Sequence, residues 1–231
     1  MNKLNIILTS YNRPRLIQMA IDSLLAQEDD RWHCYLQDDN SNDETLKVIR
    51  KYENDDHFTI GTHETTAKDR QETTRYSVLI NEILPGLRDG AVGMMCDNVT
   101  YENKLVGTIL NWLGRRPEAI CGYVTQTRDM YHQYGENDAG EYMGWASEFG
   151  HWATTPFRPG KAIASPYGNL DQSQVFYRRP IDLKWSENHD VVKFGDAEYF
   201  IRIVGRYGPI ECITPEILSC EHLLYERIHV R

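Results

Sequence analysis

The chain has 231 residues, 41% of them hydrophobic, which is enough for one large core, and we expect one domain. Its formal net charge of −9, with acidic and basic residues interspersed, disfavours a binder of duplex nucleic acid, because neutralising phosphates requires a basic face. The five cysteines show no C-x-x-C spacing, which favours buried thiols in a reducing compartment. The start of the chain runs directly into an apolar stretch, and no long apolar window follows, so we expect a cytoplasmic protein without a transmembrane segment.

Strand and helix patterns alternate through the first half of the chain. The apolar run Leu4–Leu8 predicts a strand, and Asn12 with Pro14 predicts the start of a helix. Apolar residues then recur at helical spacing as far as Leu25. The elements expected next are a strand over His33–Gln37, a helix capped near Asn42, a strand over Phe58–Ile60, a helix over Tyr76–Leu84 and a strand over Ala91–Cys96.

The second half of the chain is less regular. It predicts a helix over Glu102–Leu113, a strand over Ala119–Thr125 and a last helix that begins near Gly195. Residues 131–159 are rich in aromatic residues, glycine and proline, and they could either stack on a sugar acceptor or pack as a loop on the sheet. The alternation as a whole predicts an α/β fold with a mainly parallel sheet flanked by helices.

Two acidic corners follow two of the predicted strands. Gln37–Ser41 contains two aspartates after one strand, and Cys96–Asn98 contains one after another. In open α/β sheets, ligands bind at the carboxyl ends of the strands. Acids placed there suit a nucleotide on one side and a divalent cation on the other, so the pattern indicates nucleotide-sugar chemistry.

Five short motifs follow one another along the chain: Thr9–Asn12, Asp38–Leu46, Thr74–Tyr76, Cys96–Asn98 and Gly195–Ala197. In this order they resemble the motifs of the family 2 glycosyltransferases, most closely the spore-coat polysaccharide glycosyltransferases. The resemblance runs through roughly the first half of the chain and returns near Asp171, Asp196 and His222. It implies a single GT-A domain, which is Rossmann-like with a mixed, mainly parallel sheet. Residues 1–100 would bind the nucleotide, and residues 101–231 would bind the acceptor.

The resemblance assigns five residues to the donor nucleotide. Thr9 and Tyr11 would border it, with the Tyr11 ring facing the base, and Asp39 would accept a hydrogen bond from N3–H of uracil or thymine. Arg70 would lie beside the donor, and Asp97 would reach the diphosphate through a metal ion. Structural alternatives stay open: Asp39 could form an Asx turn or helix cap, Tyr11 could pack in the core, and Arg70 could be a solvated charge.

The metal motif of the family is depleted in this chain. Asp97 matches its last acid, but Cys96 precedes it and Asn98 follows it. One carboxylate can suffice for Mg²⁺ when phosphates and water supply the other ligands, and a cysteine could shift the preference to Mn²⁺ or simply pack in the strand. His222 matches a histidine that can be a further metal ligand, or it is a surface histidine. The expected cofactor is a divalent cation, Mn²⁺ or Mg²⁺.

Inverting transfer requires a carboxylate near the acceptor hydroxyl to take its proton. By resemblance, Asp196 is this base, and Asp171 and Glu198 are candidates for contacts with the acceptor or the sugar. Asp196 and Glu198 could instead be ordinary acids in the first turn of a helix. The resemblance therefore implies an inverting, metal-dependent glycosyltransferase that moves a sugar from a UDP- or dTDP-sugar to an acceptor hydroxyl.

Two other functions stay open. Cys96 in the metal motif is also consistent with a catalytically weakened module that only binds a nucleotide sugar. A sugar nucleotidyltransferase is disfavoured, because no Gly-rich loop with Arg or Lys follows the first strand. The sequence identifies neither the donor sugar nor the oligomeric state, and it leaves the acceptor open among a glycan, a lipid-linked sugar, a small molecule, a protein and a modified base.

Overall fold

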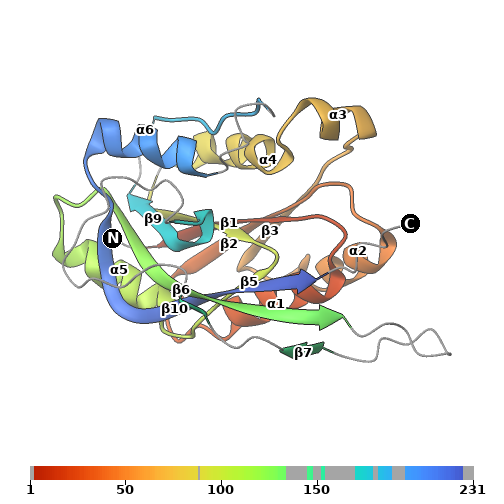
Figure 1. The fold of residues 1–231 in the computed structure, drawn as a ribbon, viewed down its shortest axis with the longest axis horizontal. Coiled ribbons are helices and arrows are strands. Elements are labelled where there is room, and N and C mark those ends of the chain that lie inside the picture. Colours follow the sequence, from red (N-terminus) through yellow and green to blue (C-terminus); the bar gives the residue numbers. More distant parts are fainter. Residues whose placement is uncertain are drawn as a thin grey trace.

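The computed structural model describes residues 3–87, 89–133, 145–147, 152–153, 170–178, 182–188 and 196–225. Most of the aromatic stretch predicted over residues 131–159 lies outside these ranges, and so does Gly195. Within them, helices cover both faces of a twisted sheet (Figure 1). Among the described residues, none of the helices combines the length and apolar content that crossing a bilayer requires.

The sheet is mixed, and its longest ladders are parallel. Its first four strands in space, β3 to β4, are all parallel to their neighbours. Beyond β4, the antiparallel pairs β4–β9, β9–β6 and β10–β5 flank the long parallel pair β6–β10. In spatial order the strands are β3 (Phe58–Thr62), β2 (Trp32–Asp38), β1 (Leu4–Ser10), β4 (Ala91–Cys96), β9 (Val175–Arg178), β6 (Cys121–Gln133), β10 (Glu211–Tyr225) and β5 (Val99–Tyr101), with β7 (Trp145–Ser147) and β8 (Trp152–Ala153) paired to β6. The expected mixed, mainly parallel α/β fold is confirmed.

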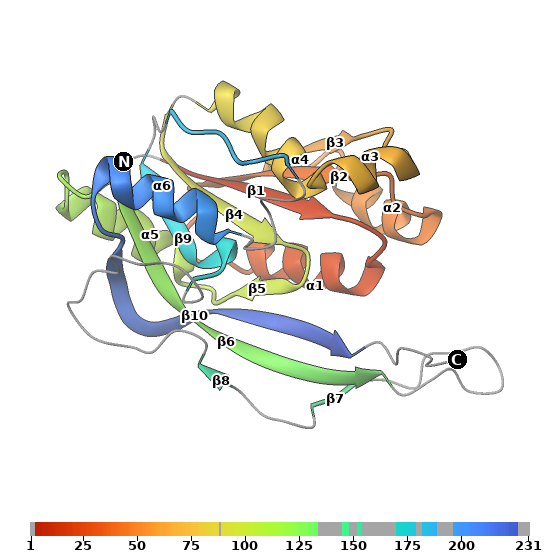
Figure 2. The same ribbon diagram turned by 45° about the horizontal axis from the view of Figure 1, so that its top comes forward.

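The strands β6 and β10 run side by side as a long curved ribbon (Figure 2). Their pairing extends from Glu211 opposite Gly122 to Tyr225 opposite His132. The register shifts between Cys212 and Ser219, in the stretch that contains a proline, as expected where a ladder hydrogen bond is lost. This ribbon carries the second half of the sheet away from the four parallel strands β1 to β4.

Two apolar cores form because strand side chains alternate between the faces of the sheet. Ile6 of β1 belongs to the core under α1 and α5, whereas its neighbour Ile7 belongs to the core under α4 and α6. Figure 1 shows these helix pairs on opposite sides of the sheet. The helices are α1 (Pro14–Leu25), α2 (Asp43–Ile49), α3 (Ala67–Glu72), α4 (Arg75–Ile83), α5 (Leu105–Arg115) and α6 (Ala197–Tyr207), with single 3₁₀ turns at Arg50–Tyr52, Leu84–Gly86 and Gln172–Gln174.

The start of α1 differs from the prediction by one residue. Pro14 lies in the first turn, where its fixed φ and missing N–H are tolerated, but the N-cap is Arg13 and not Asn12. Asn12 adopts a left-handed φ of 52°, and its Oδ1 accepts a hydrogen bond from Asn42 N at 2.7 Å. Asn42 in turn caps α2 by accepting from Thr45 N, as predicted. Asn12 therefore joins the loops after β1 and β2 instead of capping a helix.

Replacing Gly93 with alanine should destabilise the sheet where β4 meets β9. A Cβ atom at Gly93 would lie 2.6 Å from two ring carbons of Phe176, which is fully buried. The ring would have to shift, so we expect the free energy of unfolding in urea to fall by about 1–3 kcal/mol. Gly114→Ala is the matched control, because the same methyl group would meet no atom within 4 Å. Equal unfolding free energies for the two variants would contradict this account of the packing.

Candidate functional site

The carboxyl ends of β1, β2 and β4 open into one pocket of about 310 Å³. The register places Ser10 beside Asp38 and Thr9 beside Cys96, so the loops that follow these strands leave the sheet at the same edge. The pocket is lined by Thr9, Ser10, Tyr11, Arg13, Asp39, Arg70, Arg75, Tyr76, Leu79, Cys96, Asp97, Asn98 and Gln172. All the residues predicted to bind the donor nucleotide are among them.

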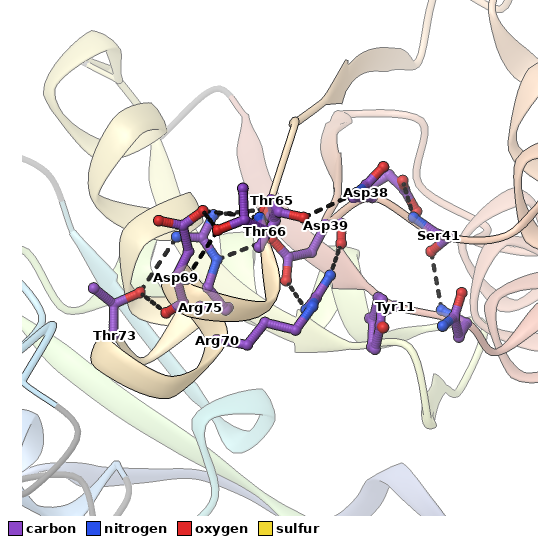
Figure 3. A network of polar contacts seen from close by, with 12 residues as sticks. Tyr11, Asp38, Asp39, Ser41, Thr65, Thr66, Asp69, Arg70, Thr73 and Arg75 are labelled. Atoms are coloured by element: carbon purple, nitrogen blue, oxygen red, sulfur yellow. Dashed lines mark hydrogen bonds and ion pairs between the residues drawn. The ribbon is translucent and has the colours of Figure 1, made fainter.

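Asp39 is the centre of a polar cluster in the pocket wall (Figure 3). Its Oδ1 accepts hydrogen bonds from Thr65 Oγ1 at 2.5 Å and from Arg75 Nε at 3.1 Å. Arg70 donates to Oδ2 and to the Asp39 carbonyl, and its guanidinium carbon lies 3.5 Å from the centre of the Tyr11 ring. Because an ionised carboxylate has about four acceptor positions, Oδ2 keeps one for a ligand.

Asp38, and not Asp39, shapes the loop after β2. Asp38 is completely buried, and its Oδ2 accepts a hydrogen bond from Ser41 N at 2.9 Å. Ser41 Oγ in turn accepts from Asn12 N, also at 2.9 Å. Asp38, and not Asp39, therefore makes the bond from a side chain to the backbone within this loop, three residues before Ser41. Its neighbour is left to face the arginines of the pocket.

Asp97 is a buried carboxylate at the end of β4. Its Oδ2 accepts hydrogen bonds from Ser10 Oγ and Tyr11 N, both at 3.3 Å, and its Oδ1 pairs with Arg13 Nη1 at 2.9 Å. Burial raises the pKa of Asp97, and the adjacent Arg13 guanidinium is the strongest influence against that rise. Arg13 therefore supplies the positive charge that a buried aspartate requires.

The divalent cation that the fold family implies fits the chemistry of Asp97. A cationic group already lies against Oδ1, and one carboxylate suffices when phosphate and water oxygens complete the coordination. Cys96 does not fit as a second ligand, because its Sγ accepts a hydrogen bond from Gln172 Nε2 and burial raises the pKa of the thiol well above its usual range. A cation would depend on Asp97 and on oxygens of the donor itself.

His222 lies on β10 and does not line the pocket. Its Nε2 is 2.8 Å from Thr100 Oγ1, and its backbone N–H donates to the carbonyl of Asn98. The residue is thus tied to the segment that follows Asp97. In the part of the chain that the structure describes, no group of three His, Cys, Asp or Glu side chains is placed to hold a metal ion.

Asp196 and Asp171 form a carboxyl pair next to the pocket. Asp196 precedes α6, and its Oδ2 accepts a hydrogen bond from the backbone N–H of Gln172 at 2.7 Å. Burial first, and the Asp171 carboxylate second, raise the pKa of Asp196 to about 8. After burial, Asp196 also contributes to the raised pKa of Tyr76, a residue of the pocket wall. The pair therefore lies close to the pocket that would hold the donor.

Glu198 makes its contacts along α6 instead. Its carboxylate pairs with Arg202 one turn further on, with Oε1 2.6 Å from Nε and Oε2 2.9 Å from Nη2. It does not line the pocket. The structure thus brings Asp171 and Asp196 together and leaves Glu198 in an ion pair of the helix surface.

Arg75, Arg13 and Gln172 are among the pocket residues that received no role from the sequence. Arg75 lies within the motif Thr74–Tyr76 but was given no role there. Arg13 carries a positive charge at the amino end of α1, where the helix dipole disfavours it, and this could have marked the residue. Gln172 offers no signal in the sequence, because its role depends on a chain reversal far from the first strands.

Comparison with known proteins agrees with this architecture. Residues 5–69 match the family model described as Glycosyl transferase family 2. Protein CgeD of Bacillus subtilis (strain 168) is 34% identical over 210 residues, which cover 87% of this chain and 46% of CgeD. The chain therefore spans about half the length of this curated relative.

Solved structures share the fold at low sequence identity. The crystal structure of S. aureus TarS 1–349 in complex with UDP has a TM-score of 0.65 at 14% identity and covers 96% of this chain and 60% of that one. The same TarS fragment in complex with UDP-GlcNAc has a TM-score of 0.66, covering 96% and 58%. The mannosyltransferase PcManGT from Pyrobaculum calidifontis, in complex with GDP-Man and Mn²⁺, has a TM-score of 0.56 at 11% identity and covers 98% and 58%.

The strand order, the pocket at the carboxyl edge and these structural matches define the GT-A class of glycosyltransferase folds. The resemblance to the family 2 glycosyltransferases is confirmed, because residues 5–69 match the family model and CgeD is 34% identical over 87% of the chain.

Replacing Asp196 with asparagine should stabilise the protein increasingly as the pH rises. The carboxyl keeps its proton up to about pH 8 in the folded state but loses it near its ordinary value of 3.8 in the unfolded chain. The carboxyl therefore contributes its full stabilisation below pH 3.8. As the pH rises from there to about 8, this contribution to the free energy of unfolding falls by up to about 1.4 kcal/mol per pH unit. The amide lacks this dependence.

Thermal unfolding of Asp196→Asn and wild type between pH 5 and 9 measures this difference. The exposed Asp30→Asn variant is the control, and its melting temperature should follow that of the wild type at every pH. A difference between Asp196→Asn and wild type that stays constant over this range would show that the carboxyl titrates normally.

Proposed function

We propose that this domain is an inverting glycosyltransferase that moves a sugar from a UDP- or dTDP-sugar to an acceptor hydroxyl with the help of Mg²⁺ or Mn²⁺. The observation that carries the proposal is the shared pocket: Asp39 and Asp97 line it, and the Asp171–Asp196 pair lies next to it. Such an arrangement offers one carboxylate for the nucleobase, one for a cation at the diphosphate and one for the proton of the acceptor. The complexes of TarS with UDP and with UDP-GlcNAc support a nucleotide-sugar donor.

In the proposed donor site, Asp39 Oδ2 accepts N3–H of uracil or thymine. These bases present the same donor there, which is why UDP and dTDP are not distinguished. A base that stacks on Tyr11 replaces the Arg70 guanidinium over that ring, and Arg70 then becomes available to the phosphates. Thr9 borders the nucleotide from β1.

In the proposed transfer step, Asp196 is the general base. The acceptor oxygen attacks the anomeric carbon from the face opposite the diphosphate, its proton passes to the Asp196 carboxylate, and the bond between the anomeric carbon and the diphosphate oxygen breaks. A bound cation would stabilise the charge that develops on the departing diphosphate. Gln172 N–H orients the base by its hydrogen bond to Oδ2.

We place the donor in residues 1–100 and the acceptor in residues 101–231. In support of this division, the residues that line the pocket all precede residue 101 except Gln172. Asp171 stays a candidate for binding a sugar or acceptor hydroxyl, whereas the Arg202 ion pair favours a structural role for Glu198. The acceptor itself is a glycan, a small molecule, a protein or a modified base.

A second candidate function is a module that binds a nucleotide sugar without transferring it. It is favoured by Cys96, which replaces an acid of the metal motif and is engaged by Gln172. Donor binding of ordinary strength, with neither hydrolysis nor transfer across an acceptor panel, would select this function over the first.

Calorimetric titration of UDP, dTDP and GDP, with Mn²⁺ and then with a chelator, tests the donor site. We expect UDP and dTDP to bind, and Asp39→Asn to weaken this binding on the order of tenfold or more, because a hydrogen bond to a charged group is lost. Asp97→Ala should remove the effect of Mn²⁺, and Asp30→Asn should change nothing. If no diphosphate binds under either condition, the transferase proposal is wrong.

The rate of UDP release from a UDP-sugar, with an acceptor panel or with water, tests the role of Asp196 as general base. Asp196→Asn should abolish release while nucleotide affinity stays near that of the wild type. In the wild type, kcat/KM should rise with pH and level off above about pH 8, because only the ionised carboxylate accepts the proton. A flat profile between pH 6 and 9, or undiminished turnover of the variant, would remove Asp196 from the mechanism.

A further inference from the structure

Arg13 occupies a position that its helix does not explain. It is the N-cap of α1, it makes no side-chain cap hydrogen bond, and a positive charge at this end of a helix is unfavourable. Its guanidinium instead lines the pocket and pairs with Asp97 Oδ1. The role of the residue therefore has to be sought in the pocket.

The two oxygens of Asp97 have different partners. Oδ2 is held by Ser10 Oγ at the end of β1 and by Tyr11 N just after it, whereas the Arg13 guanidinium is the one hydrogen-bond donor to Oδ1 among the described residues. Removal of Arg13 would free Oδ1 without disturbing the bonds that position the carboxylate. Oδ1 is thus the atom at which one cation can be exchanged for another.

The Arg13 side chain is also able to leave. Its side chain is 51% exposed, whereas that of Asp97 is only 6% exposed. A long, half-exposed side chain in a single ion pair is held weakly, because water can replace the lost partner. The buried aspartate, in contrast, cannot remain without a cation beside it. The Arg13 guanidinium is therefore more easily replaced beside Asp97 by another cation than removed without a replacement.

We propose that Arg13 is the resident counter-ion of Asp97, that it gives way to a divalent cation only when a nucleoside diphosphate is present, and that its guanidinium then binds the diphosphate. This inference deepens the proposed function and rests on it for the second and third parts. The first part, competition between Arg13 and a divalent cation, stands on the geometry of the ion pair alone.

The composition of the site explains why a divalent cation should not displace Arg13 unaided. Asp97 is the only carboxylate at the end of β4, since Cys96 and Asn98 flank it. A single carboxylate binds Mg²⁺ or Mn²⁺ weakly, and the guanidinium repels a second cation. A diphosphate changes both the weak coordination and the repulsion. It brings oxygen ligands for the cation, and it is an anion with which the displaced arginine can pair.

The test measures binding of Mn²⁺ alone by the paramagnetic resonance signal of free Mn²⁺. Wild type should bind Mn²⁺ weakly, and Arg13→Gln should bind it on the order of tenfold more tightly, because Oδ1 is released. The double variant Arg13→Gln/Asp97→Asn should lose this gain. Arg15→Gln removes the same charge two residues further on, outside the pocket lining, and should behave as wild type.

A second measurement titrates UDP in the presence of a chelator and then of Mn²⁺. Without metal, Arg13→Gln should bind UDP roughly tenfold more weakly than wild type, since a charged contact to phosphate is lost, and Mn²⁺ should strengthen its binding by a larger factor than in wild type. Arg13→Lys keeps a positive charge and should resemble wild type in both measurements. Circular dichroism and melting temperature show that each variant is folded.

The outcomes separate the two proposals. If no protein binds UDP but Arg13→Gln still gains Mn²⁺ affinity through Asp97, the donor proposal fails and the counter-ion role of Arg13 stands. If Arg13→Gln and wild type bind Mn²⁺ equally, the counter-ion role is overturned whether or not UDP binds. If Mn²⁺ binding changes as expected but UDP binding under chelation does not, the contact between Arg13 and the diphosphate is wrong.

Discussion

The common register of β1, β2 and β4 is the constraint on which the site depends. Because the last residues of these parallel strands are paired in register, the loops after Ser10, Asp38 and Cys96 leave the sheet at one edge. Short polar contacts then fasten the loops to one another, as in the bond between Asn12 and Asn42 and that between Ser41 and Asn12. The pocket is therefore held by backbone pairing below it and by loop contacts around it.

Each carboxylate that lines the pocket is paired with arginine. Asp39 is neutralised by Arg70 and Arg75, and Asp97 by Arg13. Buried carboxylates are stable only with such partners, so the acids that would contact a ligand are first held by arginines. An anionic ligand can share these arginines with the aspartates, because each guanidinium has five N–H donors. A protein with a net charge of −9 can thus present positive charge at this one place.

Much of the structure of residues 1–100 could be predicted, because each element there is encoded within a few neighbouring residues. The strand at Leu4–Leu8, the cap at Asn42 and the corner at Asp97 are each encoded within a few residues, and the structure contains all three. Asn12 was misplaced by one residue because its side chain is used by a loop thirty residues away. Local sequence preferences cannot predict a hydrogen-bond partner that lies near only because the sheet is formed.

The second half was less predictable for the same reason. The strand β5 has three residues, too few for a periodic pattern, and β10 contains a proline and a register shift where a strand pattern is broken. Arg75 and Gln172 meet the first strands only after chain reversals that leave no trace in local spacing. The resemblance to a family was needed to connect Asp196 to the pocket, because no short-range feature distinguishes it from an ordinary acid before a helix.

Gln172 links the end of β4 to Asp196, the proposed general base. Its backbone N–H holds Asp196 Oδ2, while its side-chain amide donates to Cys96 Sγ at the end of β4. The residue that replaces an acid of the metal motif is therefore linked through one glutamine to the carboxylate that would take the acceptor proton. An acid at position 96 would bring a fourth carboxyl group next to Asp97, Asp171 and Asp196, whose charges add to the effect of burial in raising the pKa of Cys96. A neutral thiol accepts the amide of Gln172 without adding that charge. Cys96 in the metal motif is thus compatible with Asp196 as a general base, and a bound cation would depend on Asp97 and the donor phosphates.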